Sequence, residues 1–169
     1  MSSTPAPSGP PPPEPPAGRV LGLRHAGITV RDLDVSLRFY RDALGLEVTV
    51  RRDSTGPHLA GVTGMPVDRL RKANLALPGT AIDLELLQWG GLERRSGASR
   101  PCDWGSGHVC LYVDGLDGLL ADLRAAGHAR DAGEPHAFLE GPNAGARVLY
   151  VTDPDGYVIE LYEAASQAP

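Results

Sequence analysis

The sequence contains an internal repeat, which restricts the chain to folds built from two similar modules. The segment that starts at His25 aligns without a gap with the segment that starts at His108, 83 residues further along. The identical positions are His25/His108, Val30/Val113, Leu33/Leu116, Asp34/Asp117 and Leu37/Leu120. Each half then ends in an apolar segment that carries one glutamate, Glu85 in the first and Glu160 in the second. Two histidines and two glutamates, one pair in each half, therefore indicate a metal site at a pseudo-twofold axis.

Hydrophobic periodicity and turn residues predict the order βαβββ in both halves. The first half is expected to contain a helix that Asp32 or Asp34 caps and Gly45 ends, with strands at 23–30, 46–52, 70–77 and 81–89. The second half is expected to contain a helix at 116–126, with strands at 108–113, near 129, at 147–152 and at 157–162. Residues 153–156, Asp-Pro-Asp-Gly, are a strong turn signal between the last two strands. The predicted fold class is α+β, with two βαβββ modules whose curved mixed sheets surround a metal-centred cavity.

The distribution of proline and glycine divides the chain into one folded domain and two tails. Residues 1–18 hold eight of the 16 prolines and almost nothing apolar beyond alanine, so we expect a disordered tail with polyproline II character. Residues 19–164 are expected to form a single domain, with modules at 20–89 and 107–163, a polar linker at 90–106 and a mobile loop at 53–68. Residues 165–169 are expected to form a C-terminal tail.

Composition excludes several classes of protein. The chain is 41% hydrophobic and 22% charged, which is ordinary for a soluble globular domain. A net charge of −5 does not favour nucleic acid binding, which needs a basic surface. No apolar run approaches the roughly 20 residues of a membrane span. The N-terminus lacks the apolar core of a signal peptide, so we expect a cytoplasmic protein. The two cysteines, Cys102 and Cys110, form no disulfide framework and suit a reducing compartment.

Strand alternation predicts that all four candidate ligands point away from the helices. In the first strand of each half the apolar side chains must face the helix, so His25 and His108 face the concave side of the sheet. Glu85 and Glu160 face the concave side for the same reason. Two imidazoles and two carboxylates suit a zinc, nickel, cobalt, manganese or iron(II) ion with open coordination positions. The alternative is that these are ordinary strand histidines and edge glutamates without a metal.

Other side chains are weaker candidates for the site. Asp83 shares the face of Glu85 and is a competing ligand, a partner of a ligand or a solvated carboxylate. Cys110 is expected to line the pocket rather than act as a nucleophile, and Tyr162 to offer a hydrogen bond there. A basic group is either a solvated edge or a clamp for an anionic substrate; its members are Arg51, Arg52, Arg69, Arg71 and Lys72. The remaining histidines are expected to be exposed: His58, His128 and His136.

Several segments together with the repeated βαβββ order resemble the vicinal oxygen chelate superfamily. That superfamily includes glyoxalase I, methylmalonyl-CoA epimerase, extradiol dioxygenases, fosfomycin-resistance transferases and bleomycin-binding proteins. The segments are 39–46 (FYRDALGL), 84–88 (LELLQ), 107–114 (GHVCLYVD) and 153–160 (DPDGYVIE). The resemblance spans residues 22–163 and implies metal ligands at His25, Glu85, His108 and Glu160. Because the oxygen-activating and thiol-transfer relatives typically need no carboxylate at the place of Glu85, the resemblance is closest to the glyoxalase I and epimerase branch.

This branch implies a divalent-metal-dependent isomerase, epimerase or lyase. It would act through an enediolate on a small α-hydroxycarbonyl or thioester substrate, with Glu160 or Glu85 as the catalytic base. The alternatives are an extradiol-type dioxygenase, a thiol transferase and a non-catalytic drug-binding resistance protein. Because family members pair their modules within or between chains, we expect a homodimer that takes a small-molecule substrate and binds neither nucleic acid nor membrane.

Overall fold

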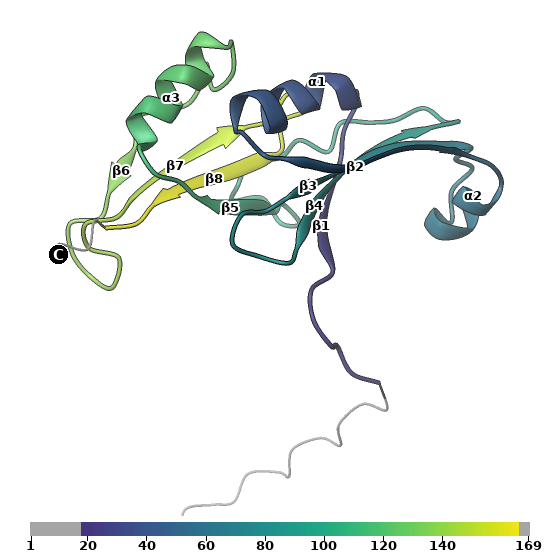
Figure 1. Ribbon diagram of the computed structural model, residues 1–169, viewed down its shortest axis with the longest axis horizontal. Coiled ribbons are helices and arrows are strands. Elements are labelled where there is room, and N and C mark those ends of the chain that lie inside the picture. The colour runs from purple at the N-terminus through teal and green to yellow at the C-terminus, as the bar shows by residue number, and fades with distance from the viewer. Residues whose placement is uncertain (1–17, 166–169) are drawn as a thin grey trace, which may run out of the picture.

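The computed structural model describes residues 18–165, which form the two predicted βαβββ modules (Figure 1). The first module has a four-stranded sheet in the order β1-β4-β3-β2, and the second has one in the order β5-β8-β7-β6. In each module the first and last strands pair in parallel and the other neighbours pair antiparallel. The predicted α+β class is therefore confirmed.

The first module begins with strand β1 (His25–Thr29) and helix α1 (Leu33–Leu37), which continues into the π-helical segment η1 (Arg38–Ala43). The Asp32 carboxylate caps α1 by accepting the backbone N–H groups of residues 34 and 35. Gly45 ends the helical segment with φ of +74°, a backbone conformation that glycine adopts readily. The remaining elements are β2 (Val48–Thr55), α2 (His58–Thr63), β3 (Arg69–Ala76) and β4 (Asp83–Gly90).

The second module repeats this order of strands, and its last three strands are shorter than their counterparts in the first module. Its elements are β5 (His108–Tyr112), α3 (Leu116–Ala125), β6 (His136–Ala137), β7 (Arg147–Thr152) and β8 (Val158–Glu163). The predicted turn between β7 and β8 forms: the N–H of Gly156 donates to the carbonyl of Asp153 at 3.0 Å, and Gly156 has φ of +88°.

Two expectations about connecting segments were wrong. The segment 53–68 is not a loop throughout, because β2 extends to Thr55 and is followed by α2, in which Leu59 is buried. The short strand expected near Ala129 lies instead at 136–137, since Ala129 has φ of +50° and cannot continue a strand. The expected tails at 1–18 and 165–169 lie almost wholly outside the described residues.

One hydrophobic core joins the two modules. Helices α1 and α3 lie on the same side of the two sheets, and buried side chains from both modules pack beneath them (Figure 1). The fully buried members include Phe39, Leu75, Leu84, Leu86, Leu116, Leu123, Ile159 and Leu161. Each such side chain contributes roughly 1.5–3 kcal/mol relative to exposure, so the shared core is the main force that holds the modules together.

Polar and aromatic contacts add to this junction. The Tyr40 hydroxyl donates to Asp153 Oδ2 at 2.9 Å across the modules. The backbone N–H of Arg31 donates to Asp155 Oδ2 at 2.7 Å, and the ring of Phe39 meets that of His128 edge to face at 5.2 Å. The modules therefore meet through their helix sides, which leaves the concave sheet faces open to other contacts. No helix within residues 18–165 has the length and apolar character needed to cross a membrane.

Candidate metal centre

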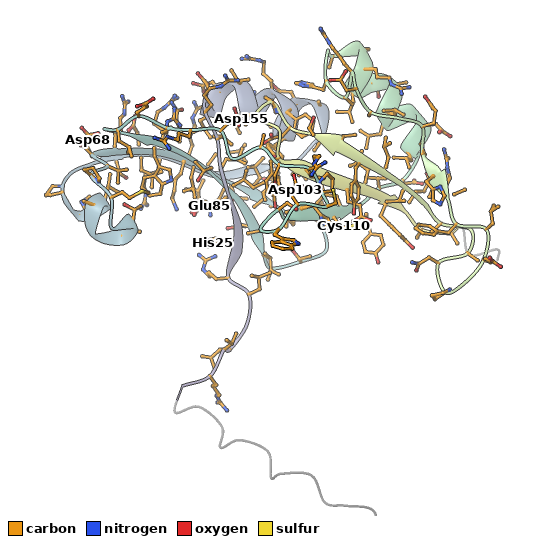
Figure 2. The ribbon with its side chains drawn as sticks, turned by 180° about the vertical axis from the view of Figure 1, so that it is seen from behind. His25, Asp68, Glu85, Asp103, Cys110 and Asp155 are labelled. Atoms are coloured by element: carbon orange, nitrogen blue, oxygen red, sulfur yellow. The ribbon has the colours of Figure 1, made fainter. Side chains whose placement is uncertain are left out.

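The first candidate pair, His25 and Glu85, lies on neighbouring parallel strands. β1 pairs with β4 so that His25 stands opposite Asp83, one pleat from Glu85. Leu84 and Leu86 are fully buried under α1, so Glu85 between them points to the other face, as alternation predicts. His25 Nε2 lies 3.6 Å from Glu85 Oε2, and Figure 2 shows both residues in the first module.

A cationic partner holds the other oxygen of Glu85. The Lys72 ammonium on β3 donates to Glu85 Oε1, and both side chains are largely buried. The carboxylate thus faces Lys72 with one oxygen and His25 with the other. This pairing compensates the buried negative charge, which would otherwise be strongly destabilising.

Two more polar residues surround Glu85. Asn74 stands directly opposite Glu85 in the β3–β4 register, and its Nδ2 donates to Asp83 Oδ2 at 3.1 Å. Asp83 therefore accepts a hydrogen bond from Asn74. Of the three roles that the sequence allowed for Asp83, this contact argues against a carboxylate that only water solvates.

The second candidate pair, His108 and Glu160, lies at the equivalent place in the second module. His108 Nε2 is 2.9 Å from Glu160 Oε2, and the His108 ring lies 5.4 Å from the ring of Tyr150. Burial, with a smaller effect from Glu160, raises the pKa of Cys110 to about 11. A thiol with this pKa is protonated near neutral pH, which argues against a nucleophilic role for Cys110. Tyr162 packs edge to face on Tyr112 at 5.5 Å.

The four predicted ligands form two separate pairs, one in each module, and do not meet in a single cluster. Within residues 18–165, no group of three or more His, Cys, Asp or Glu side chains lies close enough to hold a metal ion. Figure 2 shows this separation, with His25 and Glu85 in one module and Cys110, two residues after His108, in the other. Each pair nevertheless offers one imidazole nitrogen and one carboxylate oxygen near each other, and this donor set fits half of a divalent-ion site.

The basic group of the first module is mostly neutralised. Arg51 and Arg71 both bond to Asp34, which lowers the pKa of that carboxyl. Arg69 forms two hydrogen bonds with Asp53, and Lys72 bonds to Glu85. These pairings favour a structural role for the group over the anionic clamp.

Sequence patterns did not point to Asn74 and Tyr150 as neighbours of the ligands, and they placed Lys72 only in the basic group. Lys72, Asn74 and Tyr150 share the concave faces with the predicted glutamates, as alternation allows. What singles them out is cross-strand register, because Asn74 opposes Glu85 and Tyr150 opposes Glu160. The register between distant strands is not written in the local sequence.

Comparison with known proteins agrees with this architecture. A family model described as the glyoxalase/bleomycin resistance protein/dioxygenase superfamily matches residues 22–161. The chain belongs to this superfamily. The family predicted from the motifs is therefore confirmed.

Superfamily relatives include named enzymes. A 2-epi-5-epi-valiolone epimerase of Actinomyces sp. is 30% identical over 153 residues, which cover 88% of this chain and 82% of the epimerase. A lactoylglutathione lyase of Haemophilus influenzae is 30% identical over 155 residues, which cover 86% of this chain and 95% of the lyase. The glyoxalase family protein from Bacillus cereus has the same fold, with a TM-score of 0.71 at 21% identity over 89% of this chain and 98% of its own. The names of the relatives support an isomerase or lyase role.

Proposed function

We propose that this protein is a divalent-metal-dependent isomerase, epimerase or lyase that acts on a small α-hydroxycarbonyl or thioester substrate. The observation that carries the proposal is the pair of matched half-sites. Each half places a histidine Nε2 within 3.6 Å or 2.9 Å of a glutamate oxygen, on the face opposite the helices. His25, Glu85, His108 and Glu160 would hold the ion.

A divalent ion at these residues would supply Lewis-acid chemistry, polarising the substrate carbonyl and stabilising the charge left when the adjacent carbon loses its proton. The protein must supply a base for that proton. Delivery of the proton to the neighbouring carbon isomerises the substrate, and delivery to the opposite face epimerises it. The reaction conserves all atoms and needs no oxidant.

Glu160 is better placed than Glu85 to be that base. Glu85 is held from both sides, by Lys72 and by His25. Glu160 lies against the imidazole of His108 and against Cys110 and Tyr150, with no lysine or arginine ion pair to it among residues 18–165, and its side chain is more exposed than that of Glu85. A carboxylate that no lysine ammonium holds would reach a substrate proton more easily, so Glu160 would transfer the proton.

A homodimer would complete the site. The shared core and the Tyr40–Asp153 hydrogen bond hold the two modules of one chain together on the side that carries the helices. Folding the concave faces onto each other within one chain would break that junction. A second copy would bring His108 and Glu160 to His25 and Glu85 without such a cost. Exposed aromatic side chains on and beside the second sheet, Trp104 and Tyr112, offer apolar area for this contact.

The named relatives favour this chemistry. The Actinomyces relative is named an epimerase, and the Haemophilus relative is named a lyase. Both names fit removal of a proton from a carbon next to a carbonyl. We therefore propose the same type of proton transfer for this chain.

Metal analysis and isotope exchange test the proposal. Purified protein should carry close to one divalent ion per completed site, and turnover in heavy water should place deuterium on the carbon beside the carbonyl. Glu160→Gln should keep much of the metal yet slow the exchange on the order of a hundredfold or more. Glu85→Gln is the matched control in the other half-site, and exchange that survives Glu160→Gln but fails in Glu85→Gln would move the base to the first module.

Other outcomes would replace the proposal. Strict dependence on iron(II) and dioxygen would indicate a dioxygenase. Thiol-dependent turnover would indicate a transferase. Tight binding of a drug-like molecule with no metal and no exchange would indicate a sequestering protein.

A further inference from the structure

The two half-sites carry the same ligand types but have different surroundings. Asn74 on β3 stands opposite Glu85, and Tyr150 on β7 stands opposite Glu160. These two positions correspond under the pseudo-twofold that relates the modules. One is an amide and the other an aromatic ring, so the symmetry of the ligands does not extend to the walls beside them.

The neighbouring positions on the same sheet faces differ between the two modules in the same way. Lys72 in the first module corresponds to Val148 in the second, two residues before the wall residue in each case. Asp83 corresponds to Val158, because Asp83 opposes His25 and Val158 opposes His108. The first half-site therefore has a polar wall, and the second has an aromatic and aliphatic one.

Asn74 has an unused hydrogen-bond acceptor in the polar wall. The residue is only 6% exposed, and its Nδ2 is bonded to Asp83. Its Oδ1 is the one buried side-chain oxygen or nitrogen among residues 18–165 that has no hydrogen-bond partner. Buried acceptors are nearly always satisfied, so an exception beside a candidate metal ligand points to a missing donor.

The residues of the polar wall restrict the chemical class of the ligand group that could supply that donor. Asn74 Oδ1 accepts, and the Lys72 ammonium beside it donates. A carboxylate or phosphate would meet the unpaired oxygen of Asn74 and the nearby carboxylates of Glu85 and Asp83. An ammonium group would meet Lys72. A hydroxyl group both donates and accepts, and it carries no charge, so it suits this pair of neighbours best.

We propose that Asn74 is a specificity residue, and that the site takes a ketone with hydroxyl groups beyond the oxygen pair that chelates the metal. Asn74 Oδ1 accepts a hydrogen bond from one of these hydroxyls, and Lys72 donates to the oxygen of that group. This inference rests on the proposed function, because it needs the substrate to lie between the two half-sites.

The opposite wall completes the orientation of the substrate. The Tyr150 hydroxyl is engaged with the Glu160 carboxylate, and the Tyr150 ring and Val148 leave apolar surface beside it. A carbon-bound hydrogen is the part of a hydroxylated ketone that packs well against such a surface. The polar wall thus holds the hydroxyl side against the first module and turns the C–H bond toward the second. This places the acidic C–H bond on the side of Glu160, the base proposed above.

Two cyclic probes isolate the effect of the added hydroxyls. The first is 2-hydroxycyclohexanone, which has the chelating pair and no further hydroxyl. The second is a pentahydroxycyclohexanone, which has the same ring and chelating pair with hydroxyls on the other carbons. Calorimetric binding to the metal-loaded protein is measured for both, together with deuterium exchange and metal content.

The wild-type protein should bind the hydroxylated ring more tightly than the plain ring. Asn74→Leu keeps the approximate shape and removes the acceptor, together with the hydrogen bond that Asn74 Nδ2 donates to Asp83. It should weaken binding of the hydroxylated ring about tenfold and leave binding of the plain ring and the metal content unchanged. Asn143→Leu, the same substitution on an exposed loop of the second module, should leave both affinities at their wild-type values.

Equal affinity of the wild-type protein for the two rings would overturn the inference, as would an unchanged preference in Asn74→Leu. If Asn74→Leu does not fold, Asn74→Ala decides by the same comparison. Failure of the proposed function gives a different result: the wild-type protein then binds no divalent ion, and both proposals fall. Metal binding with no preference for the hydroxylated ring rejects only the role of Asn74.

Discussion

Removing the Tyr40 hydroxyl tests whether the helix-side junction holds the two modules together. Tyr40 is fully buried, and its hydroxyl donates to Asp153 Oδ2 at 2.9 Å. The other carboxylate oxygen of Asp153 accepts the backbone N–H groups of Asp155 at 2.9 Å and Tyr157 at 2.8 Å. Tyr40→Phe therefore leaves the turn intact and removes the donor that one buried oxygen of Asp153 has among residues 18–165.

The expected loss of stability follows from the charge of that acceptor. A hydrogen bond to an ionised group contributes about 1.5–3 kcal/mol, so Tyr40→Phe should lower the free energy of unfolding by about 2 kcal/mol near neutral pH. For a domain of this size each kcal/mol lowers the melting temperature by about 2–4 °C. Burial raises the pKa of Tyr40, so the hydroxyl remains a donor throughout the accessible pH range.

The pH dependence gives a second check with a definite sign. Burial raises the pKa of Asp153, and the hydrogen bond from Tyr40 opposes that rise. Tyr40→Phe should therefore raise this pKa further. Because Tyr40 stabilises the ionised form, the stability difference between the two proteins is fully present above the folded-state pKa of Asp153 in Tyr40→Phe, which is the higher of the two. It shrinks as the pH falls through that pKa, since a bond to the protonated acid contributes less.

Urea unfolding followed by circular dichroism measures both quantities. Tyr112→Phe is the matched control, because Tyr112 is exposed and its loss of a hydroxyl should change stability by less than about 0.5 kcal/mol. A Tyr40→Phe protein as stable as the control would refute the reasoning. So would a stability difference that grows toward acid pH.

Other parts of the molecule give simpler tests. His108→Ala should lower the metal content and remove the thermal stabilisation that an added divalent ion provides, and unchanged values of both would contradict its role as a ligand. In a Cys102→Ser background, Cys110 should react slowly with iodoacetamide near pH 8, where about one thiol in a thousand is ionised if its pKa is about 11; rapid labelling there would contradict the raised pKa. Ile159→Ala should cost about 2–5 kcal/mol in urea unfolding, because Ile159 is fully buried in the shared core, and a cost under about 1 kcal/mol would show that the core relaxes around the cavity.

The repeat and its alternation were sufficient to predict the modules and the direction of the key side chains. The spacing from His25 to His108 marked the two units, and the apolar neighbours of Glu85 showed which face it takes. The structure agrees, because Leu84 and Leu86 are buried while Glu85 meets His25 on the other face. Such patterns are local. Side chains alternate between the two faces of a strand with a period of two residues, so the sequence alone shows which face each residue occupies. The role of these residues as metal ligands stays a prediction.

Tertiary structure alone decided which side chains meet across strands and how the modules are joined. The Lys72–Glu85 pair and the Asn74 acceptor depend on the register of β3 against β4, and a shift of one residue would turn each side chain to the other face. The side-by-side arrangement of the modules depends on a core that both helices share, and on the buried bond between Tyr40 and Asp153, 113 residues apart. Register and module docking are set by the free energy of packing distant segments together, which no short window of sequence contains.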